Sequence, residues 1–131
     1  MNKNTELDWQ AIRTRARSFS EDAFQFVRDG LAHTVKAVHG KPVPKAVEPG
    51  DESRHVNGRQ LCQGLRDLAI ERYGLLARAV LRHWGITRTE DFGTIVYSMI
   101  DRGELRSSTK DTMEDFRGVF EFDSAFPFRL G

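Results

Sequence analysis

Apolar residues recur every three or four positions along most of this chain, which is the spacing of helices that bury one face. The clearest stripe lies between residues 89 and 102 and consists of Phe92, Ile95, Val96, Met99 and Ile100. Two earlier stripes predict two further helices, the second of which Gly40 should end. Their apolar positions are Trp9, Ile12, Ala16 and Phe19 in the first, and Ala23, Phe24, Val27, Leu31, Val35 and Val38 in the second.

Another apolar stripe runs from residue 58 to residue 84, and it is compatible with one helix or two. Its members are Leu61, Leu65, Leu68, Ala69, Tyr73, Leu76, Val80 and Trp84. Asn57 and Gln60 mark its start, because they fit a capping box in which each side chain bonds the other residue's backbone. Gly74 lies inside the run, and a glycine costs about 1 kcal/mol in a helix interior. Gly74 therefore either lies within one continuous helix, at this cost, or marks a break between two helices.

The stretch WGITRTEDFG, residues 84–93, has the pattern of a helix-turn-helix. Gly85 suits the left-handed residue that ends a helix, and Ile86 is placed to pack back on that helix. The next helix has two candidate starts, either Thr87 in a capping box with Glu90, or Thr89 followed by acidic residues. Gly103 should end it.

Neither helical nor strand periodicity is sustained after Gly103. Residues 104–108 (ELRSS) are compatible with a short strand, 109–116 with a turn or one helical turn, and 118–122 (GVFEF) with a second strand. Five of the nine phenylalanines fall between Phe116 and Phe128, so the tail 115–131 should pack on the helical body through individual rings. The Pro- and Gly-rich stretch 41–54 should be a loop.

These patterns predict one mainly α domain, 1–131, with a helix-turn-helix-like hairpin and a small C-terminal β-hairpin or irregular element. A winged helix would share this order of elements. The chain has no apolar run near the roughly 20 residues that a membrane-spanning helix needs. Its first residues lack the apolar core of a secretory signal, and a single Cys62 excludes an internal disulfide framework. We therefore expect a cytoplasmic protein.

Charge is divided unevenly along the chain. Residues 1–88 carry 15 Lys and Arg against 10 Asp and Glu, whereas residues 89–131 carry 5 against 9. The two halves should attract each other in the fold, and this layout argues against a basic surface spread over the whole domain.

The acidic outer face expected for the 88–102 helix argues against DNA reading by the hairpin. In a winged helix this second helix enters the major groove and carries basic or amide side chains. Here the expected outward positions are Glu90, Asp91, Thr94, Tyr97, Ser98 and Asp101. Arg13, Arg15 and Arg17 form the densest basic cluster, and it is either a phosphate-binding face or a solvated face paired with the acidic second half.

We predict no metal, cofactor or phosphate site, because no suitable spacing occurs. The histidines, His33, His39, His55 and His83, are scattered, and CxxC, HxxxH and glycine-rich phosphate loops are absent. Cys62 lies beside an apolar stripe and should be a small buried packing residue. A Cys–His pair with His83 or His55 remains open at this stage.

Three segments carry a family resemblance: HVNGRQLCQGLRDLAIERYG, WGITRTEDFGTIVYSMIDRGEL and DTMEDFRGVFEFDSAF. They resemble a small family of uncharacterised proteins found in planctomycetes and verrucomicrobia. The likeness covers most of the chain, from about Phe24 to Phe126, whereas the Pro-rich loop and the RTRAR segment differ. The resemblance implies a bacterial protein and brings no established activity, cofactor or partner.

Three functions are compatible with these patterns, and we expect a non-enzymatic protein-interaction or structural domain whose partner is another protein or a second copy. Its surface would combine the acidic helix face with the aromatic tail: Glu90, Asp91, Thr94, Tyr97, Asp101, Phe120, Phe122 and Phe126. The first alternative is a winged-helix-like nucleic-acid-binding domain that uses Arg13, Arg15 and Arg17. The second is a small-molecule or enzymatic site near His55, Tyr73, Trp84 and Asp91, because polar groups beside aromatic residues at helix ends can line a pocket.

Overall fold

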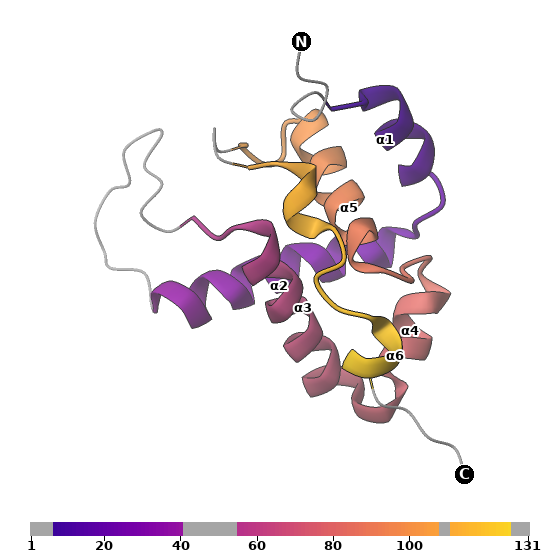
Figure 1. Cartoon of the computed structure of the whole chain (residues 1–131), viewed down its shortest axis with the longest axis vertical. Helices are drawn as coiled ribbons and strands as arrows, with labels where there is room; N and C mark the ends of the chain where they lie inside the picture. The colour runs from indigo at the N-terminus through magenta and orange to yellow at the C-terminus, as the bar shows by residue number, and fades with distance from the viewer. Residues whose placement is uncertain (1–6, 41–54, 108–110, 127–131) are drawn as a thin grey trace.

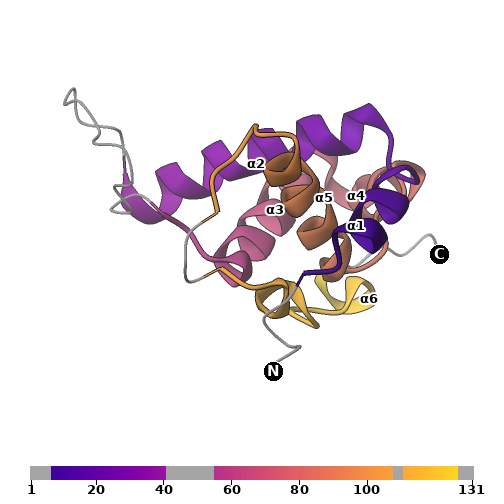
Figure 2. The same ribbon diagram turned by 90° about the horizontal axis from the view of Figure 1, so that it is seen from above.

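The computed structural model describes residues 7–40, 55–107 and 111–126, and the regular elements in these ranges are all helical. The α-helices are α1 (Trp9–Ala16), α2 (Glu21–His39), α3 (Gly58–Tyr73), α4 (Ala77–His83), α5 (Thr89–Asp101) and α6 (Phe122–Ala125), with the 3-10 helices η2 (Gly74–Leu76) and η3 (Met113–Phe116) (Figure 1). Figure 2 shows α2 along one side of the molecule and the C-terminal segment along the opposite side, with α3 and α5 between them. The prediction of a mainly helical domain is confirmed.

Helices α2 and α3 approach each other closely because each places a glycine where the two cross. Gly30 of α2 faces the side chain of Leu65, and Gly64 of α3 faces that of Thr34. A Cβ at either glycine would overlap the facing side chain, so a larger residue there would force the helices apart. This close pairing holds α2 in place as one wall of the site described below.

Helix α5 is covered on several sides, unlike an exposed recognition helix. It packs on α1, α2, α3 and η3. Trp9 of α1 and Phe116 of η3 both meet the Tyr97 ring edge to face, with centroids 6.3 and 6.4 Å away. Tyr97 and Ser98, expected on the outward face, are therefore buried. That part of the prediction is wrong, because it assumed that only one stripe of this helix faces the protein.

The first half of the turn between α4 and α5 forms as the sequence predicts. Gly85 has a φ of +98°, its N–H donates to the Arg82 carbonyl, and the N–H of Ile86 donates to the Leu81 carbonyl at 2.9 Å. These two bonds make a Schellman motif, and Ile86 is fully buried against the core. The same bonding pattern follows α5, where Gly103 and Glu104 donate to Ile100 and Met99.

The start of α5 resolves the two alternatives for that helix. The helix begins at Thr89, and the carboxylate of Asp91 accepts from the backbone N–H groups of Thr87 and Arg88 at 2.9 and 3.3 Å. The alternative capping box of Thr87 with Glu90 is wrong, because Asp91 occupies that role.

The long apolar run 58–84 is divided at Gly74, which has a φ of +54° and ends α3. The capping box of Asn57 and Gln60 at its start is confirmed. After the break, η2 turns Leu75 and Leu76 outward, leaving them 66% and 58% exposed. Leu76 therefore does not belong to the buried stripe. Val38, near the end of α2, is also exposed rather than buried.

The C-terminal region is irregular, and no strand occurs in its described residues, 104–107 and 111–126. Both strands considered for this region, at 104–108 and 118–122, are thus wrong within those ranges. The hydroxyl of Thr89, at the start of α5, donates to the Phe116 carbonyl at 2.7 Å and accepts from the Val119 N–H at 3.2 Å. These bonds to α5, rather than pairing between strands, fix the path of the segment. The predicted loop 41–54 lies outside the described residues.

Candidate functional site

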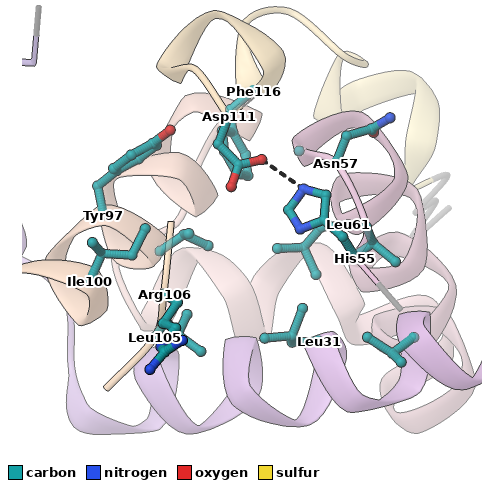
Figure 3. Close-up of a pocket in the computed structure, with 14 residues that line it drawn as sticks. Leu31, His55, Asn57, Leu61, Tyr97, Ile100, Leu105, Arg106, Asp111 and Phe116 are labelled. Atoms are coloured by element: carbon teal, nitrogen blue, oxygen red, sulfur yellow. Dashed lines mark hydrogen bonds and ion pairs between the residues drawn. The ribbon is translucent and has the colours of Figure 1, made fainter. Parts of the chain in front are cut away.

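A pocket of about 210 Å³ lies where α2, the start of α3, α5 and the residues at 105–106 and 111–116 meet (Figure 3). Most of its walls are aliphatic or aromatic, and a few polar groups stand among them. The lining residues are Leu31, Val35, His55, Val56, Asn57, Gly58, Leu61, Val96, Tyr97, Ile100, Leu105, Arg106, Asp111 and Phe116. An apolar cavity with a few polar groups is the usual form of a small-molecule site.

The apolar walls come from the edges of the predicted helical stripes. Leu31 and Val35 of α2 and Val96 and Ile100 of α5 line the pocket and are all half-buried. The absence of a side chain at Gly58 lets α3 start against η3: a Cβ there would lie 2.9 Å from the Phe116 ring. The pocket is therefore bounded by residues of several elements.

His55 and Asp111 form the main polar pair at the wall. The Nε2 atom of His55 lies 2.8 Å from Oδ1 of Asp111, and both side chains are partly buried. The backbone carbonyl of His55 is also bonded, to the Nε2 atom of His39 at 2.7 Å. Because a carboxylate only accepts hydrogen bonds, the His55 Nε2 atom must carry a proton and donate it. The backbone bond and the Asp111 contact together fix the orientation of the imidazole ring.

Tyr97 also lines the pocket, and its hydroxyl is buried within the wall. The residue is 1% exposed, and its hydroxyl oxygen has no hydrogen-bond partner among the residues that the structure describes. Burial raises the pKa of the Tyr97 phenol to about 12, and the nearby charges of Asp111 and Asp115 add to the shift. The group is therefore a neutral phenol at physiological pH. Buried polar groups without a partner are rare in proteins, and each requires a specific explanation.

Cys62 does not join this pocket. Its side chain is fully buried in the core. Burial is the main cause that raises the pKa of the thiol to about 12, and the negative charge of Glu90 also raises it. A thiol in that state does not act as a nucleophile at neutral pH. The Cys–His pair left open by the sequence is therefore wrong, and the packing interpretation of Cys62 is confirmed.

The second alternative set of site residues is dispersed. His55 lines the pocket, but Tyr73 and Trp84 meet edge to face and both pack on Phe26 elsewhere in the core, with ring centroids 5.6–6.4 Å apart. Asp91 is occupied with the backbone at the start of α5. The predicted grouping of these residues is wrong. Periodicity placed each of them near a helix end without showing that the ends lie in different parts of the molecule.

Most of the expected interaction surface is inside the protein. Asp91, Tyr97, Phe122 and Phe126 are buried. Phe120 is half-buried and packs on two other rings of the tail. Among the acids, Glu90 accepts from the Gly118 N–H, and Asp101 is paired with Arg13. With Thr94 half-buried as well, these residues do not form one exposed face.

The arginine cluster divides between partners on α5. Arg13 makes a two-bond contact with Asp101, at 2.8 and 2.9 Å, and Arg15 donates to the buried carboxylate of Asp91 at 3.0 Å. Arg17 is exposed. Two of the three guanidinium groups thus form ion pairs within the chain, as the charge layout of the sequence indicates.

Comparison with known proteins adds no relative. No protein-family model, curated protein or solved structure matches this chain. The resemblance to the planctomycete and verrucomicrobial family therefore stays a prediction.

Two further properties limit the chemistry of the described residues. Within 7–40, 55–107 and 111–126, no group of histidine, cysteine and acidic side chains could hold a metal ion. None of the helices in those ranges is long and apolar enough to cross a bilayer.

Sequence reasoning found His55 and missed most of its neighbours. Asp111 lies 56 residues further along the chain, and no periodicity connects the two. Leu31, Val35, Val96 and Ile100 were recognised only as core positions. Their half-buried state on two facing helices was the missing signal, and it requires the packing of the helices to be known.

Proposed function

We propose that this chain is a non-enzymatic binding domain that holds a small, mainly apolar ligand in the pocket between α2, α3 and α5. The observation that carries the proposal is the combination of aliphatic walls with the His55–Asp111 pair, which places a few polar atoms in a mainly apolar cavity. Such a cavity is the usual form of a small-molecule site.

The size of the pocket supports a ligand of about one ring. Drug-sized ligands occupy pockets of roughly 300–1,000 Å³, and a dry apolar cavity of about 150 Å³ is enough to bind benzene. The volume of about 210 Å³ lies near the lower of these examples.

The lining residues support binding rather than covalent chemistry. They include a histidine paired with an aspartate, and the described residues that line the pocket include no serine, threonine or cysteine that this pair could activate as a nucleophile. The proposal therefore keeps the non-enzymatic role expected from the sequence and places it in a pocket instead of on an acidic face.

A pair of matched variants on α2 tests this proposal. Val35 lines the pocket, whereas Val38, one turn further along the same helix, is exposed. We expect the Val35→Phe change to fill the pocket and abolish binding of toluene, measured by titration calorimetry. The Val38→Phe change introduces the same side chain outside the pocket and should leave toluene binding unchanged. Equal binding to both variants, or no binding to the unmodified protein, would contradict the proposal.

A second candidate function is self-association through the turn between α3 and α4. Leu75 and Leu76 are adjacent and mostly exposed, and Ile70 on the last turn of α3 is 41% exposed. Neighbouring apolar side chains on a surface commonly mark protein contacts. Sedimentation at increasing concentration should reveal a dimer that the double change Leu75→Ser and Leu76→Ser removes. A monomer at every concentration would exclude this contact between copies.

A further inference from the structure

The orientation of His55 gives the pocket a polar preference, and this inference rests on the proposed function. Asp111 accepts the hydrogen bond of Nε2–H, so in the neutral form of the ring Nδ1 is the atom that can accept a hydrogen bond. Figure 3 shows Nδ1 turned toward the pocket interior, on the side of Leu31 and Leu61. Nδ1 makes no hydrogen bond to any residue within the described ranges. A pocket with apolar walls thus presents an acceptor that is held in place from behind.

We infer that the ligand is a small apolar molecule with one hydroxyl group, such as a phenol or a cyclic alcohol, which donates its hydrogen bond to Nδ1 of His55. An acceptor on the wall selects a donor on the ligand, because an unpaired polar group would be left when any other group lies there. The aliphatic residues of α2 and α5 enclose the ring, and Nδ1 of His55 accepts the hydrogen bond of the hydroxyl group.

Tyr97 supplies ring surface to this site rather than a hydrogen bond to the ligand. Its hydroxyl lies on the same side of the pocket as Asp111 and Phe116 (Figure 3), and it is buried in the wall, where a ligand does not reach it. The polar preference of the pocket therefore rests on His55.

A comparison of phenol with toluene isolates the hydroxyl. The two rings have nearly the same shape, and burial of a hydroxyl without an acceptor is unfavourable. In a pocket without an acceptor, phenol should bind at least about fivefold more weakly than toluene. We expect the unmodified protein to bind phenol at least as tightly as toluene, measured by titration calorimetry.

Two substitutions at His55 then test which atom accepts the hydrogen bond of the ligand hydroxyl. The His55→Leu change removes the acceptor, and we expect it to reverse the order so that toluene binds more tightly than phenol. The His55→Asn change places an amide oxygen near the position of Nδ1, and it should preserve part of the preference for phenol. The His83→Leu change, at an exposed position on α4, is the control and should alter neither affinity. Circular dichroism confirms that each variant is folded.

The outcomes separate this inference from the function beneath it. Tight toluene binding with weak phenol binding, in the unmodified protein, would overturn the role of His55 and leave the apolar pocket in place. A preference for phenol that survives in His55→Leu would overturn it as well. Failure of both compounds to bind would contradict the proposed function itself.

Discussion

At the scale of single residues, Asp91 stabilises the fold instead of forming part of an exposed acidic surface. The sequence marked it both as a helix-start acid and as part of an exposed acidic face. In the structure it is 1% exposed, accepts two backbone N–H groups and receives the guanidinium of Arg15 at 3.0 Å. The local pattern predicted the first role, but the covering by Arg15 comes from a helix 76 residues earlier and leaves no local signal.

Replacement of Asp91 should therefore destabilise the protein more than replacement of a surface acid. We expect Asp91→Asn to lower the free energy of unfolding by about 1–3 kcal/mol, because charge-assisted hydrogen bonds to buried groups are lost. Asp101→Asn on the same helix is the matched control, since its ion pair with Arg13 is exposed and should contribute much less. Urea unfolding measures both, and equal losses would contradict the buried role of Asp91.

At the scale of elements, helix ends were predictable and the C-terminal segment was not. Gly40, Gly74, Gly85 and Gly103 each follow a helix with positive φ, because a left-handed residue closes the last turn. The strands expected after Gly103 do not form in the described residues. No period is sustained there from which an element could be predicted, and each aromatic ring packs at a separate place on α5 or on a neighbouring ring.

The docking of η3 on α5 depends on Gly93. A Cβ at this position would lie 2.8 Å from both the Met113 sulfur and the Phe116 ring, which is too close for either to remain in place. We expect Gly93→Ala to lower the free energy of unfolding by about 1–3 kcal/mol, the usual cost of overpacking. Thr94→Ala, one residue further, adds no volume and should change stability by less than about 0.5 kcal/mol. An unchanged free energy of unfolding in the Gly93→Ala variant would mean that η3 does not pack on α5 as described.

At the scale of the whole molecule, the uneven charge of the sequence becomes contact between its two halves. Arg13 pairs with Asp101, Arg28 with Glu104 and Arg78 with Asp123. This attraction was predictable from composition, whereas the particular pairs were not. The pocket belongs to the same scale, because it needs α2, α3, α5 and the segment beyond α5 together. No single stretch of sequence contains enough of it to be recognised.

Acid should weaken this arrangement in a defined range. The bond from Arg13 lowers the pKa of Asp101, and the bonds from Gln25 and Arg72 lower that of Asp29. A carboxyl group with a lowered pKa in the folded state stabilises the protein above its unfolded pKa, about 3.9. That contribution is lost as the pH falls below this value through the folded pKa. Urea unfolding from about pH 6 to pH 2 should show the decline. The double change Asp29→Asn and Asp101→Asn should make it shallower, and an unchanged slope would contradict these pairings.

The most direct test of the account is to locate a bound ring in the protein by nuclear Overhauser contacts. With methyl-labelled protein and excess toluene, we predict contacts from the ring protons to the methyl groups of Leu31, Val35 and Ile100, and their loss in Val35→Phe. Contacts only to the exposed Leu75 and Leu76, or no contacts at all, would show that the pocket beside α5 is not a binding site.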